Sequence, residues 1–166
     1  MWRERPILAL DPGQRTGWAL SDGRTGTLDL SAELRRKAYG LASCTWHDWL
    51  DGLIEASDPS ALVVERAFFV GRFTPIAGFT SHLVLLAGMI GHSRNVPPRE
   101  MAAAQVRDWL VPGWRAVKSE RKRDAMILDA VRARGFSPAT VHAADAAAVL
   151  VAHAKMPPRA SATEGA

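Results

Sequence analysis

The chain has 166 residues, of which 48% are apolar, so it is long and apolar enough for one domain with a sizeable core and is not a disordered chain. Its single cysteine, Cys44, excludes a disulfide framework or a cysteine-rich zinc site and is typical of a reducing compartment, where we expect it to be a small buried residue. The net charge of +4 lies in one segment, because residues 94–134 hold ten Lys or Arg and only five Asp or Glu. Such a segment favours a nucleic-acid partner, although it also suits a plain solvated helix face.

The first third of the chain predicts a hairpin, a third strand and a helix. Residues 7–11 and 16–21 are apolar runs separated by Pro-Gly, and residues 26–30 follow an Asp-Gly turn. A helix is predicted from residue 31 to about 56, with a stripe at three- and four-residue spacing. The stripe consists of Leu34, Ala38, Leu41, Thr45, Trp49 and Leu53.

The rest of the chain alternates strands and helices. A buried strand is predicted over 61–65, a helix over about 75–92, and an edge strand within 95–101, because Pro97-Pro98 cannot donate to a central ladder. Helices follow at about 102–109, 119–134 and 140–155. We therefore expect one domain over residues 1–155 and a disordered tail over 156–166. No apolar run is long enough for a bilayer span or a signal peptide, so a cytoplasmic protein is expected.

Three acids interrupt otherwise apolar elements. Asp11 ends the first strand, Glu65 ends the fourth, and Asp145 lies inside the last helix. Taken alone, Asp11 could simply cap the Pro-Gly turn. The order of elements predicts an α/β fold with a mixed sheet, in which the first three strands are antiparallel and the fourth and fifth are parallel. The ends of strands one and four can then meet, and a helix across that edge can deliver Asp145.

Several blocks together resemble the RuvC family of Holliday-junction resolvases, within the ribonuclease H-like superfamily. The first block is Asp-Pro-Gly followed by Thr-Gly, the second is Val-Val-Glu with Phe68 three residues after Glu65, and the last is His-Ala-Ala-Asp-Ala at 142–146. Gln105-Val106-Arg107 and Lys118-Ser119 resemble stretches that hold DNA-contacting bases in that family. The first block is one residue shorter than usual and Arg107 replaces a lysine. Ala19-Leu20-Ser21-Asp22 also resembles the RuvC-like nucleases of ribosomal RNA maturation.

The resemblance implies a ribonuclease H-like five-stranded mixed sheet flanked by helices and a site that uses two Mg²⁺ ions, with Mn²⁺ as a substitute. Oxygen donors suit Mg²⁺, and two such ions can activate water and hold the leaving oxygen of a phosphodiester. We expect Asp11 to bridge the ions, Glu65 to bind one of them and Asp145 the other. His142 lies three residues before Asp145 on the same helix face and is expected to ligate a metal, position water or contact phosphate, although a structural role is the alternative. His153 is expected to be structural.

Aromatic and basic residues supply the expected DNA contacts. Phe68 and Phe69 would stack on bases or wedge between them, and the basic side chains would contact phosphates. Phe68 could instead anchor the loop in the core, and Lys118 could be an ordinary surface residue. The expected DNA-binding residues are Phe68, Phe69, Arg72, Arg107, Lys118, Arg121, Lys122 and Arg123.

The predicted function is that of a Mg²⁺-dependent, structure-selective endonuclease that cleaves branched DNA and resolves Holliday junctions by paired nicks. Two nicks related by a two-fold axis favour a homodimer, with the apolar helix over 75–92 as the expected contact. The alternatives are a nuclease of the same fold that acts on RNA and a nucleic-acid-binding protein without cleavage. The sequence does not identify the preferred cleavage site or a helicase partner.

Overall fold

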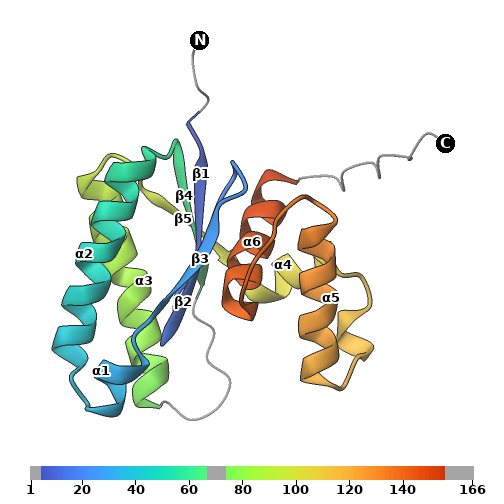
Figure 1. The fold of residues 1–166 in the computed structure, drawn as a ribbon, viewed down its shortest axis with the longest axis horizontal. Coiled ribbons are helices and arrows are strands. Elements are labelled where there is room, and N and C mark those ends of the chain that lie inside the picture. The colour runs from blue at the N-terminus through green and yellow to red at the C-terminus, as the bar shows by residue number, and fades with distance from the viewer. Residues whose placement is uncertain (1–4, 67–73, 156–166) are drawn as a thin grey trace.

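A computed structural model describes residues 5–66 and 74–155 and shows a five-stranded mixed sheet between two layers of helices (Figure 1). The strand order is β3-β2-β1-β4-β5. The strands are β1 (Ile7–Asp11), β2 (Arg15–Leu20), β3 (Thr25–Asp29), β4 (Ala61–Arg66) and β5 (Pro98–Ala102). The expected α/β fold, with the ribonuclease H-like five-stranded mixed sheet flanked by helices, is confirmed.

The pairing follows the expected directions. The first three strands are antiparallel, with Asp11 opposite Gly17, and β4 and β5 join as parallel strands, with Leu10 beside Val64. Parallel pairing is possible here because helices separate β3 from β4 and β4 from β5 along the chain. Strand β5 begins at Pro98 and lies at the sheet edge, where the missing proline N–H leaves no gap in a ladder.

The helices cover the two faces of the sheet unequally. Figure 1 shows α2 (Tyr39–Ser57) and α3 (Pro75–Ser93) on one side, and α4 (Ala103–Leu110), α5 (Glu120–Arg132) and α6 (Val141–Ala154) on the other. The continuous helix expected from residue 31 to 56 is wrong: α1 (Ser31–Arg35) ends before α2 begins. Lys37 adopts a left-handed conformation (φ 57°), and the Ala38 N–H donates to the Glu33 carbonyl, which closes α1 and reorients the chain.

Alternation along β1 sends its side chains into two separate cores. Leu8 and Leu10 pack among residues of α2 and α3, whereas Ala9 packs with α6. On α2 the buried stripe is Ala42, Trp46, Leu50 and Ile54. The expected stripe was therefore one position out of phase, because it was continued across the break at 36–38, and Leu41 is 60% exposed. Cys44 is also exposed rather than buried.

Helix α3 is apolar on more than one side. Phe79, Leu83 and Ile90 pack in the core, but Leu85 and Met89 are each 69% exposed. In the described part of the chain, α3 is the one helix long and apolar enough by length and composition to cross a membrane, contrary to expectation. The same length and composition occur in helices that pack in a globular core, as one face of α3 does here.

Candidate active site

The sheet points Asp11 and Glu65 toward the same helical layer. Successive side chains of a strand alternate between faces. Asp11 therefore shares its face with Ala9, and Glu65 shares its face with Val63, and both Ala9 and Val63 belong to the core that contains α6. Leu10 pairs with Val64 in the parallel ladder, so the two acids follow side by side at the carboxyl ends of neighbouring strands.

Helix α6 delivers two further groups to this edge. Thr140 caps its first turn by accepting a hydrogen bond from the Ala143 N–H (3.1 Å). Gly17 of β2 lies directly under that turn, where an added Cβ would be 1.8 Å from the His142 carbonyl oxygen. Only a glycine allows the helix to approach the sheet so closely, and this approach brings His142 and Asp145 over the end of β1.

The turn after Asp11 is held by a buried hydroxyl. Thr16 Oγ1 donates to the Gly13 carbonyl (3.0 Å) and accepts a hydrogen bond from Trp46 Nε1 (2.9 Å). Both Thr16 and Trp46 are fully buried. Trp46 is thus a core residue, and its indole N–H also fixes the turn that follows Asp11.

Three of the predicted groups form a compact cluster. Asp11, His142 and Asp145 each offer one ligand atom, and these atoms lie within 4.8 Å of one another, close enough to hold a metal ion. Glu65 lies outside this group, but its charge raises the pKa of Asp11. All four sequence-predicted residues therefore gather at one edge of the sheet.

The carboxylates resist ionisation because they are buried together. Burial, followed by the charges of Glu65 and Asp145, raises the pKa of Asp11 well above its ordinary value. Burial raises the pKa of Glu65 to about 7 and that of Asp145 to about 6, although the positive charge of Arg107 opposes both shifts. Such crowding of acids favours a bound cation, and oxygen donors of this kind suit hard divalent ions.

His142 is suited to act as a neutral ligand. Burial lowers its pKa, and the positive charge of Arg15 lowers it further. A neutral imidazole has a free nitrogen lone pair for a metal ion or a hydrogen bond. His153 lies at the other end of α6, and burial lowers its pKa as well.

Arg107 of α4 faces the acids, and Trp114 borders it. Its charge acts on Asp11, Glu65 and Asp145, and its guanidinium lies 5.6 Å from the centroid of the Trp114 ring. Trp114 Nε1 in turn donates to Asp108 (2.7 Å). Arg107 therefore places a positive charge beside the carboxylates. It was predicted to contact phosphate, but its position next to the acids was not predicted.

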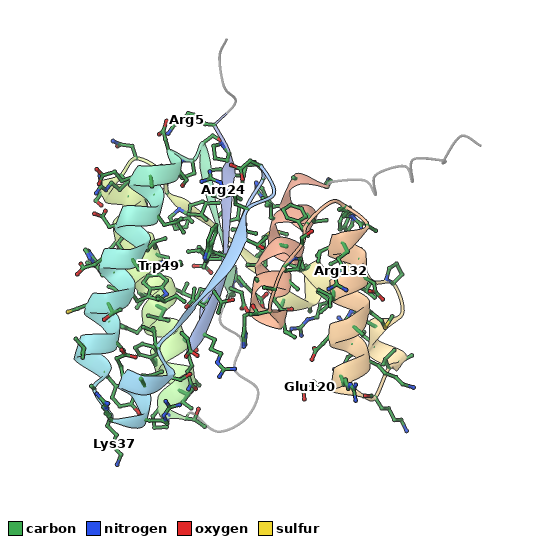
Figure 2. All side chains as sticks on the ribbon, viewed as in Figure 1. Arg5, Arg24, Lys37, Trp49, Glu120 and Arg132 are labelled. Carbon is green, nitrogen blue, oxygen red and sulfur yellow. The ribbon has the colours of Figure 1, made fainter. Side chains whose placement is uncertain are left out.

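The remaining predicted DNA-binding residues are distributed differently. Phe68, Phe69 and Arg72 lie outside the described residues. Arg123 lines a cavity of about 100 Å³ with Arg107 and Asp124, and Asp124 also raises the pKa of Asp145. The exposed residues Lys118, Arg121 and Lys122 lie at the start of α5. Figure 2 shows the neighbouring Glu120 at the lower end of α5, the end at which α6 also begins in Figure 1.

Sequence reasoning missed several residues that shape the site. Gly17 was noted only as part of a Thr-Gly dipeptide, and Thr16 and Asp124 were given no role. The short Pro-Gly turn between the first two strands is the signal that could have predicted the pairing of Asp11 with Gly17, since a short turn places residues on either side of it opposite each other. The sequence contains no local signal for Asp124, because its proximity to Asp145 arises only from the packing of α5 against α6.

No protein-family model matches the chain, and no curated protein is significantly similar to it in sequence. Solved structures do match. RuvC of Thermus thermophilus in complex with a Holliday junction substrate is 18% identical, with a TM-score of 0.67 over 91% of this chain and 93% of that one. A second structure of T. thermophilus RuvC, also 18% identical, has a TM-score of 0.64 over 90% and 93% of the two chains. The chain therefore has the fold of RuvC over nearly its whole length, as the sequence motifs predicted.

Proposed function

We propose that this chain is a divalent-metal-dependent endonuclease that cleaves branched DNA and resolves Holliday junctions by paired nicks, an activity of the crossover junction endodeoxyribonuclease type used in DNA recombination and repair. The observation that supports it most strongly is the cluster of Asp11, His142 and Asp145 beside Glu65 at the carboxyl ends of two parallel strands. A protein of the same fold, T. thermophilus RuvC, has been solved with a Holliday junction substrate. We place the nuclease domain at residues 1–155 and the protein in the cytoplasm.

Each residue of the cluster has a distinct task in this proposal. Asp11, Glu65 and Asp145 would hold two Mg²⁺ ions through their carboxylate oxygens. Ions held there would generate hydroxide from bound water and stabilise the leaving oxygen of the phosphodiester. His142 would complete the ligand set as a neutral imidazole. Arg107 would hold a phosphate of the substrate against the cluster, in the way that a guanidinium grips phosphate oxygens.

A homodimer would supply the two sites that paired nicks require. Helix α3 is its proposed contact, because Leu85 and Met89 are largely exposed and a large apolar side chain in water favours burial by a partner. Leu85→Lys with Met89→Lys should shift sedimentation toward the monomer and convert paired nicks into single nicks. A wild-type chain that stays monomeric on the junction and still makes both nicks would contradict the dimer.

One assay tests the function directly. A labelled four-way junction, a linear duplex and a structured RNA are each incubated with the protein in Mg²⁺, in Mn²⁺ and in EDTA. We expect cleavage of the junction in both metals, with none in EDTA. Asp11→Asn should lower cleavage at least about a hundredfold and leave junction binding intact, because it removes a metal ligand and not a phosphate contact. Preferred cleavage of RNA, or binding without any cleavage, would contradict the proposal.

A further inference from the structure

A cavity opens from the acidic cluster toward α1, which lies across the sheet from α5 in Figure 1. It has a volume of about 440 Å³ and reaches from Asp11 and His142 to α1. Two arginines line it: Arg15, at the start of β2, and Arg35, at the end of α1. Neither residue belongs to the basic segment at 94–134, and the two lie twenty residues apart in the sequence, so only the fold brings them to one cavity.

The two guanidinium groups are available to a ligand. Arg35 is exposed, and within the described part of the chain it makes no ion pair, side-chain hydrogen bond or ring contact. Arg15 makes one 3.2 Å hydrogen bond to Asp29, but both side chains are more than half exposed, and such surface pairs contribute little. Asp29 also accepts a 2.8 Å hydrogen bond from the Ser31 N–H at the start of α1, so it retains a partner when Arg15 turns to another anion.

The position of the pair suits a nucleic-acid strand that crosses the cluster. A strand carries a phosphate on every nucleotide, so the phosphates on both sides of the cut approach the protein along with the one that reacts. The carboxylates repel these flanking phosphates, and cations must hold them in place. Arg107 and the start of α5 offer positive charge on one side of the acids, and Arg15 and Arg35 offer it in the cavity on the other.

We propose that Arg15 and Arg35 form a phosphodiester-binding subsite that holds the cleaved strand next to the cut, on the side of the acidic cluster opposite α5. The proposal rests on the proposed function and adds the path of the strand across the site. The planar guanidinium of Arg35 binds phosphate oxygens in pairs. Arg15 lines the same cavity and supplies the second guanidinium of the subsite.

A double-mutant cycle between protein and DNA tests the subsite. Junctions are made with a single neutral methylphosphonate at each position around the cut in turn, and affinity is measured by fluorescence anisotropy in Ca²⁺. We expect one position at which the neutral linkage weakens wild-type binding roughly tenfold, the scale of a charged hydrogen bond. Arg35→Gln should weaken binding of the unmodified junction by a similar factor and lose the methylphosphonate effect at that position alone.

The adjacent Arg36→Gln is the matched control, because Arg36 is also exposed and does not line the cavity. It should weaken binding less than about twofold, since long-range charge effects are screened by salt, and should keep the full methylphosphonate profile. If Arg35→Gln and Arg36→Gln show the same methylphosphonate effects at every position, the proposed subsite is contradicted. The affinity cycle decides this whether or not the strand is cut, whereas a wild-type protein that cleaves no branched DNA would contradict the proposed function instead.

Discussion

Glu65→Gln should stabilise the metal-free protein while it abolishes cleavage. Burial and the charge of Asp145 raise the pKa of Glu65 from 4.5 to about 7, although the positive charge of Arg107 opposes this shift. Ionised Glu65 therefore destabilises the folded state when no cation is bound. A neutral amide of the same shape removes this cost, which comes mainly from burying the charge and partly from Asp145, and it also removes one ligand from the site.

The size of the destabilisation follows from the pKa shift of Glu65. One pKa unit corresponds to about 1.4 kcal/mol, so full ionisation of Glu65 costs the folded state up to about 3 kcal/mol. At pH 8.5 Glu65 is ionised in both the folded and the unfolded chain, and the whole cost applies. As the pH falls below about 7, the folded carboxyl binds a proton while the unfolded one remains ionised. The cost therefore shrinks, and it is absent below about pH 4.5.

Urea unfolding in EDTA at pH 8.5 and at pH 5 measures this directly. We expect Glu65→Gln to be more stable than the wild type by about 1–3 kcal/mol at pH 8.5, with most of that difference gone at pH 5. Adding Mg²⁺ at pH 8.5 should stabilise the wild type more than the variant, because bound metal favours the folded state. Glu100→Gln is the control, since Glu100 forms an exposed pair with Arg66, and its effect should stay below about 1 kcal/mol at both pH values.

A Glu65→Gln variant that is no more stable than the wild type at pH 8.5 in EDTA would contradict this prediction. The same holds if its advantage does not change between pH 8.5 and pH 5. Either result would mean that burial and the charge of Asp145 do not penalise ionised Glu65 in the folded protein. The proposal that this cluster holds a cation would then lose its electrostatic basis.

Three further changes test other parts of the site. Asp145→Asn should lower the cleavage rate at least about a hundredfold without weakening DNA binding in a gel-shift assay, and wild-type cleavage would remove this residue from the metal site. Reversing the charges of Lys118 and Arg121 together should reduce the salt dependence of DNA binding by roughly one unit of slope per lost phosphate contact, and an unchanged slope would mark both as surface residues. Gly17→Ala places a methyl group 1.8 Å from the His142 carbonyl oxygen. It should therefore destabilise the fold by at least about 2 kcal/mol in urea unfolding, and an unchanged midpoint would show that α6 does not pack so closely.

The strands and the faces of their acids were predictable from the sequence. Strands β1 and β4 are short apolar runs that each lead into an acid, and a period of two residues makes Asp11 share a face with Ala9, and Glu65 with Val63. These patterns are local, because the apolar or polar character of each residue in a strand indicates which face of the sheet it occupies. The edge position of β5 followed in the same way from Pro97-Pro98. The motif blocks resemble those of the RuvC family, and this resemblance predicted that the acids share one site. The RuvC fold of the chain is confirmed.

Only the tertiary structure shows the features that depend on how helices and strands pack against one another. The break at Lys37 shifted the buried stripe of α2 by one position, because a single left-handed residue resets the phase of a helix and leaves only a weak trace in composition. Gly17 matters only because α6 lies on it, and Arg107 faces the carboxylates only because α4 packs against α6. Arg35 lines the cavity beside Asp11 only because a separate helix, α1, ends there. These residues come together because segments that are distant in the sequence pack against each other. The free energy of that packing is summed over the whole core, so no short stretch of sequence predicts which residues become neighbours.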